Sequence, residues 1–295
     1  MKAAEFDYVR AGSLAEVCDL LADPDIETKI IAGGQTLVPL MAMRMARPER
    51  LVDINHVAEL QGIRLEGDEL VIGACTRQRH AERSAEVQAA VPLLALALTF
   101  VGHTQTRNRG TVGGSIVNAD PSAEIALVAT ALDATMVCVS RDGETARPAS
   151  AFFEDVMTTA IEETECLVAV RFPVWRSGPA AGVGFHEISA RASDFAVASA
   201  AAQMVLDGAG ACERVTLAVG GVAAKPFRVE AAIAGLTGAM PDDSALAAAV
   251  AHIDPFVEIA TEDATELAYR RGLARTVAER ALRDARDAAR KGLSQ

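Results

Sequence analysis

The sequence contains few aromatic residues and no clustered cysteines. Phe, Trp and Tyr make up 4% of its 295 residues, which argues against an aromatic stacking platform for nucleobases or sugars. Zinc ribbons and iron–sulfur loops need grouped thiolates, and the cysteines lie far apart. Their odd number and the lack of a secretory signal favour reduced, buried thiols in a cytoplasmic protein. The five are Cys18, Cys75, Cys138, Cys166 and Cys212.

Excess positive charge and long apolar runs are also missing. Lys and Arg number 28 against 40 for Asp and Glu, and the resulting net charge of −12 opposes binding to nucleic acid or to an anionic membrane. The longest apolar stretch, residues 91–101, is too short to span a bilayer. Hydrophobic residues nevertheless make up 51% of the chain. The composition therefore predicts a soluble, acidic, globular protein without a metal site or a disulfide framework.

Length and patterning predict two domains, at about residues 1–175 and 176–295. In the first, residues 1–56 have the pattern of a small α/β unit, in the order helix, strand, glycine turn, helix and strand. Residues 57–175 form its second subdomain. The cluster at residues 176–179 reads as a turn or linker that leads into the second domain.

Local patterns predict individual elements within these domains. Ser13 followed three residues later by Glu16 indicates a capping box and a helix through Leu21. A turn at residues 67–68 between two strand-like runs predicts a hairpin, and Pro92 divides an Ala- and Leu-rich helical stretch. Further strands are expected at residues 29–32, 51–54, 134–139, 166–172, 196–206 and 215–219, with helices at 36–45, 123–132 and from Arg228 onward.

Two glycine loops carry the main functional signal. The first consists of Ala32, Gly33, Gly34, Gln35 and Thr36, and the second of Thr111, Val112, Gly113, Gly114 and Ser115. Paired glycines allow backbone N–H groups to approach an anion closely, and a helix N-terminus nearby adds a favourable dipole. The first loop lies between a predicted strand and helix, and the second shortly before the helix at 123–132. The loops are either tight turns or the two sides of a pyrophosphate site, and the residues alone leave both readings open.

Other catalytic and nucleotide-binding motifs are missing. The sequence contains no Gly-x-Gly-x-x-Gly after a strand, no phosphate-binding loop ending in Gly-Lys-Ser/Thr, no Gly-x-Ser-x-Gly and no His-Glu-x-x-His. The five histidines are scattered, so we nominate no catalytic acid, base or nucleophile.

In combination with their flanks, the two loops resemble the FAD-binding medium subunit of the molybdenum hydroxylases, the family of xanthine dehydrogenase and aerobic carbon monoxide dehydrogenase. The resemblance covers essentially the whole chain in order, which makes it far more specific than one pair of glycines. The segments that carry it are residues 32–39, 51–54, 105–115, 118–121, 191–196, 269–271 and 280–282.

This resemblance implies an α+β chain. A two-part FAD-binding domain of the vanillyl-alcohol-oxidase/PCMH type would be followed by a C-terminal antiparallel sheet with a helical bundle. The two loops would grip the pyrophosphate and ribityl chain of FAD. At matching positions the resemblance also implies contacts to FAD for Glu124, with Asp120 close by, for Leu167 beside the flavin ring, and for His186, where some relatives have lysine. Ser115 stands where asparagine is common.

The implied function is that of an oxidoreductase subunit. The chain would carry FAD, accept electrons from the [2Fe-2S] clusters of a small subunit and pass them to an external acceptor. A large subunit with the molybdenum cofactor would hydroxylate the organic substrate, in a dimer of heterotrimers. Two alternatives stay open, a stand-alone FAD-dependent oxidoreductase of related fold and a flavin-free assembly module. Intact glycines in both loops argue against the second, and no catalytic constellation after residue 176 supports the first.

Overall fold

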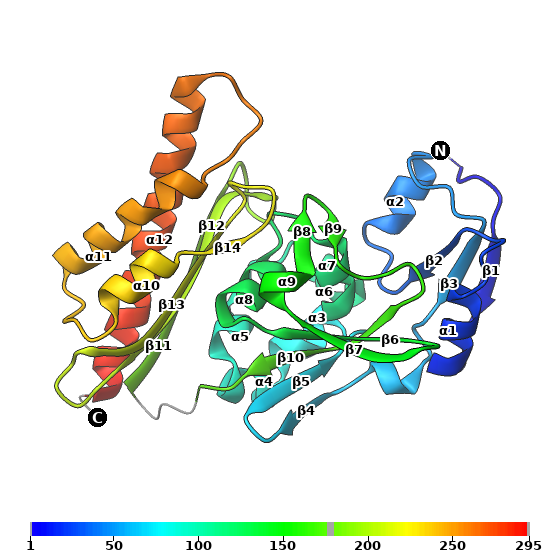
Figure 1. Ribbon diagram of the computed structural model, residues 1–295, viewed down its shortest axis with the longest axis horizontal. Coiled ribbons are helices and arrows are strands. Elements are labelled where there is room, and N and C mark those ends of the chain that lie inside the picture. The colour runs from blue at the N-terminus through cyan, green and yellow to red at the C-terminus, as the bar shows by residue number, and fades with distance from the viewer. Residues whose placement is uncertain (1, 176–179, 294–295) are drawn as a thin grey trace.

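Three larger sheets follow one another along the long axis of the molecule (Figure 1). The computed structural model describes residues 2–175 and 180–293. The turn or linker predicted at residues 176–179 lies outside the described residues. No helix in the described ranges combines the length and apolarity needed to cross a membrane.

The N-terminal unit is a parallel sheet with the strand order β1-β3-β2. Ser13 caps its first helix, because the Ser13 hydroxyl accepts a hydrogen bond from the Glu16 N–H at 3.2 Å, as the capping-box pattern predicts. β1 was not expected, because this short strand is largely exposed and has no apolar alternation. The elements are β1 (Asp7–Arg10), α1 (Leu14–Leu21), β2 (Thr28–Ile31), α2 (Leu37–Ala42) and β3 (Arg50–Asp53).

The central unit is an antiparallel sheet with the order β4-β5-β10-β6-β7. The predicted hairpin is confirmed, and Pro92 begins α5 as expected, although Ser84 adds a second break by capping α4. The strands are β4 (Ile63–Glu66), β5 (Glu69–Gly73), β6 (Thr135–Ser140), β7 (Gly143–Pro148) and β10 (Cys166–Pro173), with a small β8 (Phe153–Asp155) and β9 (Thr158–Thr159) pair. The helices are η1 (Ala58–Leu60), α3 (Gln78–Arg83), α4 (Ala85–Ala90), α5 (Pro92–Leu98), α6 (Thr104–Arg109), α7 (Val112–Asn118), α8 (Glu124–Leu132) and α9 (Ala149–Phe152).

The C-terminal unit is an antiparallel sheet, β11-β12-β13-β14, with helices on its outer face (Figure 1). The predicted strands at 196–206 and 215–219 are present. β11 was missed because Gly182 and Gly184 interrupt its apolar pattern. Side chains at those two positions would collide with backbone carbonyls of α12, so glycine in β11 and alanine in α12 permit close packing. The elements are β11 (Ala181–Ser189), β12 (Ala196–Leu206), β13 (Cys212–Gly220), β14 (Phe227–Arg228), α10 (Glu230–Leu236), α11 (Asp243–Val250), η3 (Ala251–Phe256) and α12 (Ala264–Leu293).

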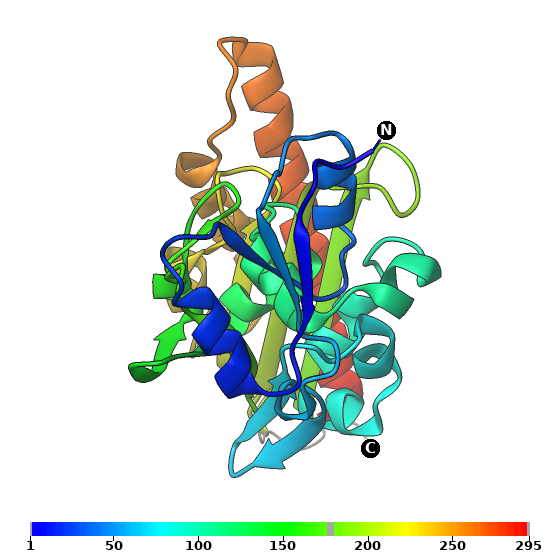
Figure 2. The ribbon, with the colours of Figure 1, turned by 90° about the vertical axis from the view of Figure 1, so that its right-hand side faces the viewer.

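The helix α8 joins the central and C-terminal units. Every residue from Ile125 to Leu132 is buried, because α8 packs against β10 on one side and against β12 and β13 on the other. A helix that is apolar all round is typical of such a sandwiched position. The view along the long axis shows the N-terminal unit in front of these layers (Figure 2).

The five cysteines are free and buried, as the sequence predicts. Burial raises the pKa of Cys75 and of Cys138 to about 12, and that of Cys212 to about 11. These thiols therefore stay protonated at neutral pH and pack as small apolar side chains.

Candidate functional site

A cleft of about 1290 Å³ lies where the N-terminal and central units meet. Its walls include both glycine loops, the beginning of α8 and the first residues of β10, and residues 193–195 of the C-terminal unit reach it as well. Pockets for drug-sized ligands usually enclose about 300–1,000 Å³. The cleft is therefore large enough for an extended dinucleotide.

The first glycine loop presents unused backbone donors to the cleft. Gly34, Gln35 and Thr36 all line it, and no acceptor among the described residues takes their backbone N–H groups. Gly34 has a φ of +69°, a conformation that favours glycine, and the Gln35 side-chain amide donates to the Gly33 carbonyl at 3.1 Å. Consecutive N–H groups without partners form a concavity suited to an anion.

The second glycine stretch is not a loop ahead of the next helix, as we expected, but the first turn of a helix of its own, α7. The Thr111 hydroxyl caps this helix by accepting from the Gly114 N–H at 3.1 Å. The N–H groups of Val112 and Gly113 donate to the carbonyls of Thr76 and Ala74. This cap and these tertiary hydrogen bonds outweigh the low helix propensity of the paired glycines.

The absence of side chains at two glycines lets the backbone segments approach closely. A Cβ atom on Gly33 would lie 2.5 Å from the Arg109 carbonyl oxygen and 2.9 Å from the Gly110 Cα atom. A Cβ atom on Gly113 would lie 2.5 Å from the Ala74 Cβ atom. Gly33 therefore brings the first loop against the approach to the second, and Gly113 seats α7 on the turn that follows β5.

The structure brings most of the predicted site residues together. Val112 is instead fully buried in the core. His186 lies on β11, where its Nε2 atom is 2.8 Å from Asp284 Oδ2 of α12, and it is not among the cleft residues. The predicted residues that line the cleft are Ala32, Gly33, Gly34, Gln35, Thr36, Thr111, Gly113, Gly114, Ser115, Asp120, Glu124 and Leu167.

The charged side chains around the cleft are almost all acidic. Among the described residues that line it, Lys29 is the single Lys or Arg. An anionic ligand must therefore be held mainly by backbone N–H groups and by the dipoles of the peptide units rather than by cationic side chains. The acidic residues are Asp23, Asp25, Glu27, Glu49, Asp120, Glu124, Glu162, Glu163, Glu165 and Asp194.

The Glu124 carboxyl group can line an anion-binding cleft because its pKa is raised. Burial, followed by repulsion from Glu187 and Asp120, raises the pKa of Glu124 to about 7. Glu187 lies on β11, and burial raises its pKa to about 7 as well. Its Oε2 atom is buried without a hydrogen-bond partner among the described residues. Near neutral pH Glu124 is therefore protonated for much of the time and can donate a hydrogen bond.

Sequence reasoning missed part of the cleft lining. Residues 161–165 between β9 and β10 carry no motif, so nothing in their pattern pointed to a site. Phe195 is 73% exposed at the cleft, although aromatic side chains are scarce in this chain. It lies in a segment that carried the family resemblance, but exposure of an aromatic ring cannot be read from sequence.

Comparison with known proteins identifies the fold and the cofactor. Residues 4–175 match the model of the FAD binding domain in molybdopterin dehydrogenase. The chain belongs to this family. Residues 184–285 match the CO dehydrogenase flavoprotein C-terminal domain. Membership confirms the predicted α+β architecture and FAD as the cofactor, so the chain is the FAD-binding subunit of a molybdenum hydroxylase-type dehydrogenase, an oxidoreductase.

Full-length relatives support this assignment. The chain is 38% identical over 294 residues to the 6-hydroxypseudooxynicotine dehydrogenase complex subunit alpha of Paenarthrobacter nicotinovorans, covering 98% of this chain and 97% of that one. It is 33% identical to the carbon monoxide dehydrogenase medium chain of Hydrogenophaga pseudoflava, with 94% and 96% covered.

Solved structures show the same architecture. A carbon monoxide dehydrogenase structure from Hydrogenophaga pseudoflava superposes with a TM-score of 0.92 at 34% identity, over 98% of this chain and 99% of that one. Quinoline 2-oxidoreductase from Pseudomonas putida 86 gives a TM-score of 0.90 at 34% identity, with the same coverage.

Proposed function

We propose that this molybdopterin dehydrogenase family member holds FAD in the cleft and conducts electrons from the iron–sulfur clusters of a partner chain to an external acceptor. The observation that carries the proposal is the first glycine loop. It presents three consecutive N–H groups, which have no acceptors among the described residues, to a cleft whose charged side chains are almost all carboxylates. Free backbone N–H groups can bind an anion without cationic side chains, so the arrangement suits the pyrophosphate of a dinucleotide.

The chain's own residues have distinct tasks in this proposal. The N–H groups of residues 34–36 bind the pyrophosphate, and the α7 turn at residues 113–115 forms the facing wall. Protonated Glu124 donates a hydrogen bond to the cofactor, and Leu167 packs beside the flavin ring. Bound flavin supplies the ability to exchange either one or two electrons. The protein binds and orients the cofactor and sets the electrostatic field around it.

The proposed partners are a small [2Fe-2S] subunit and a large subunit with the molybdenum cofactor, in a cytoplasmic dimer of heterotrimers. Across residues 2–175 and 180–293, no group of three or more His, Cys, Asp and Glu side chains is arranged to hold a metal ion. The proposal accordingly assigns the iron–sulfur clusters and the molybdenum to other chains. The domain at residues 1–175 would hold FAD, and the domain at 176–295 would close the cleft from the side of residues 193–195.

Electron transfer to the chain can be tested directly. The purified full-length chain is loaded with FAD, and the separately purified iron–sulfur subunit is reduced with dithionite and desalted. Mixing the two without oxygen should re-oxidise the clusters as the flavin is reduced, so the electron paramagnetic resonance signal of the reduced clusters should disappear. The same subunit mixed with flavin-free chain should keep this signal. A signal that persists with both cofactors present would contradict the proposed direction of transfer. Oxidation of organic substrates by the FAD-loaded chain alone would instead favour a stand-alone oxidoreductase.

A further inference from the structure

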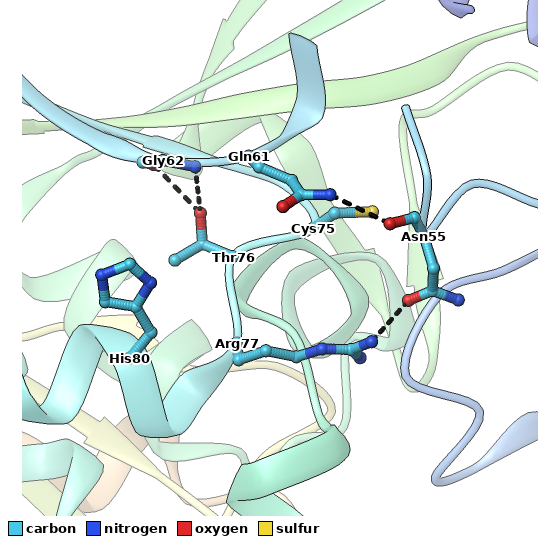
Figure 3. A pocket seen from close by; sticks show the side chains of 7 residues that line it. All are labelled: Asn55, Gln61, Gly62, Cys75, Thr76, Arg77 and His80. Atoms are coloured by element: carbon cyan, nitrogen blue, oxygen red, sulfur yellow. Dashed lines mark hydrogen bonds between the residues drawn. The ribbon is translucent and has the colours of Figure 1, made fainter. Parts of the chain in front are cut away.

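A smaller cavity of about 330 Å³ lies beside the glycine loops (Figure 3). One wall comes from the segment after β3 and the other from the turn between β5 and α3. Figure 3 shows the Arg77 side chain extending across this cavity toward Asn55. The lining residues are Asn55, Gln61, Gly62, Cys75, Thr76, Arg77 and His80.

The Arg77 guanidinium group joins Asn55 to the end of α6, just before the second glycine loop. One nitrogen, Nη2, donates to the Asn55 Oδ1 atom at 2.8 Å. Another, Nη1, donates to the backbone carbonyl of Arg109. That carbonyl is the atom against which Gly33 packs. Arg77 thus fixes the position of the backbone surface on which the first loop rests.

Asn55 completes the connection on the side of the first loop. Its Nδ2 group donates to the Ala32 carbonyl at 2.8 Å and to Asp53 Oδ1 at 2.6 Å. Asp53 in turn accepts a hydrogen bond from the Tyr8 hydroxyl. The chain of hydrogen bonds therefore runs from β1 and β3 through Asn55 to Arg77. It reaches the backbone of the first loop at Ala32 and, at Arg109, the end of α6 just before the second loop.

Neither Asn55 nor Arg77 lines the large cleft. We propose that Arg77 and Asn55 are positioning residues for the cofactor site, which hold the two glycine loops at the separation that FAD requires. This inference rests on the proposed placement of FAD between the loops. The planar guanidinium has two donors in fixed directions, which lysine lacks, so it is suited to join two acceptors of set geometry. Binding sites lose affinity when supporting residues allow their contacts to shift by about 1 Å.

The test is a double-mutant cycle on FAD affinity in the full-length chain. FAD is titrated into apoprotein, and the dissociation constant is measured from the change in flavin fluorescence. Arg77→Ala and Asn55→Ala should each weaken binding at least tenfold, and the double variant should be little worse than either single variant. Arg64→Ala is the matched control, because Arg64 is exposed and, among the described residues, its side chain pairs only with exposed Glu66. It should bind FAD like the wild type.

Chemical rescue separates positioning from general stability. Arg77→Ala leaves room for a free guanidinium ion next to a cavity that is already present. Guanidinium chloride, at concentrations far below those that unfold proteins, should therefore restore FAD affinity in Arg77→Ala but not in Asn55→Ala, and equal sodium chloride should restore neither. Arg77→Lys should remain impaired while keeping the melting temperature of the wild-type apoprotein. If Arg77→Ala does not fold, Arg77→Lys and Asn55→Ala decide the question.

The positioning role of Arg77 and Asn55 and the placement of FAD between the loops would be contradicted by different results. The positioning role is wrong if Arg77→Lys and Asn55→Ala bind FAD as tightly as the wild type does. It is also wrong if the losses of binding free energy in Arg77→Ala and Asn55→Ala add in the double variant. If the wild-type chain binds no FAD, or if groups outside the two loops prove to hold its pyrophosphate, the proposed cofactor placement is wrong.

Discussion

Gly33 packs directly against the backbone carbonyl of Arg109. A Cβ atom on residue 33 would lie 2.5 Å from that oxygen, closer than real Cβ atoms approach other heavy atoms. The opposing group is backbone and is itself held by Arg77, so it cannot rotate away as a side chain could. The contact therefore demands glycine at residue 33 for reasons of packing, independently of any ligand.

Replacement of Gly33 by alanine should push the two glycine loops apart. We expect Gly33→Ala to weaken FAD binding more than tenfold and to lower the melting temperature of the apoprotein. Gly272→Ala in α12 is the control, because nothing lies within 4 Å of the added methyl group. It should leave FAD binding unchanged and, as a helix-interior glycine, stabilise the chain by up to ~1 kcal/mol. Wild-type affinity in Gly33→Ala would show that the spacing of the loops does not matter.

Features that depend on a few neighbouring residues could be predicted from the sequence. The capping box at Ser13, the hairpin turn at residues 67–68 and the helix break at Pro92 are local, so their chemistry is visible in the pattern. The two glycine loops could be nominated for the same reason. Their separation in the chain gave no information about how they meet in space.

Features that depend on tertiary contacts could not be predicted. The glycine pair at 113–114 has low helix propensity. It becomes helical because Thr111 caps the turn and because the Val112 and Gly113 N–H groups donate to carbonyls far away in the sequence. Likewise, nothing in the pattern around Asn55 and Arg77 predicts that their hydrogen bonds link the first loop to the end of α6. The pairing of His186 with Asp284 depends on where α12 crosses β11. Its predicted contact with FAD remains a prediction.

The two glycines of α7 should respond differently to alanine. Gly113→Ala forces the helix away from Ala74 and should lower the melting temperature of the apoprotein strongly. A Cβ atom on Gly114 would lie 2.7 Å from the Thr111 hydroxyl oxygen alone, and this hydroxyl can rotate away at the cost of the helix cap, about 1 kcal/mol. Gly114→Ala should therefore be mildly destabilised, and Gly114→Val should lose FAD because its larger side chain enters the cleft. Thermal melts and flavin content measure both effects. Normal flavin content in Gly114→Val would remove this turn from the cofactor site.

FAD affinity should depend on the ionisation of Glu124. Since the pKa of Glu124 is raised to about 7, its carboxyl becomes negatively charged as the pH rises through that value. A negative charge at the cleft wall repels an anionic cofactor, so the affinity for FAD should fall between about pH 6 and pH 8. Glu124→Gln mimics the protonated form and should flatten the profile. Glu163→Gln is the control, because Glu163 is exposed at the same cleft, and it should retain the wild-type profile.

The same ionisation should affect stability in a defined direction. Because the folded-state pKa of Glu124 lies above its unfolded value near 4.5, the folded chain binds more protons between these values. The stabilising contribution is complete below about pH 4.5 and is lost as the pH rises through about 7. Urea unfolding of the apoprotein at pH 6 and pH 8 should show a smaller pH effect in Glu124→Gln than in the wild type. An equal effect in both would assign the titration to another group.

Glu165, another carboxyl group in the cleft lining, should affect stability in the reverse sense. It is 6% exposed, and burial alone would raise its pKa, but hydrogen bonds from Thr145, the Glu162 N–H and Arg147 outweigh burial and lower it. The stability that this carboxylate contributes is therefore present above its unfolded pKa and is lost as the pH falls.

Removal of Arg147 should expose the cost of burying this carboxylate. The Arg147 Nη1 atom lies 3.0 Å from Glu165 Oε2 and 3.1 Å from Glu165 Oε1. Arg147→Ala therefore leaves a buried negative charge without its cation. We expect a loss of about 3 kcal/mol in the free energy of unfolding at pH 7, measured by urea denaturation. Arg64→Ala breaks an exposed pair and should cost at most ~1 kcal/mol. Because protonation relieves the buried charge, the difference between Arg147→Ala and the wild type should shrink as the pH falls toward 4. A constant difference would mean that the loss comes from packing of the arginine stem rather than from charge.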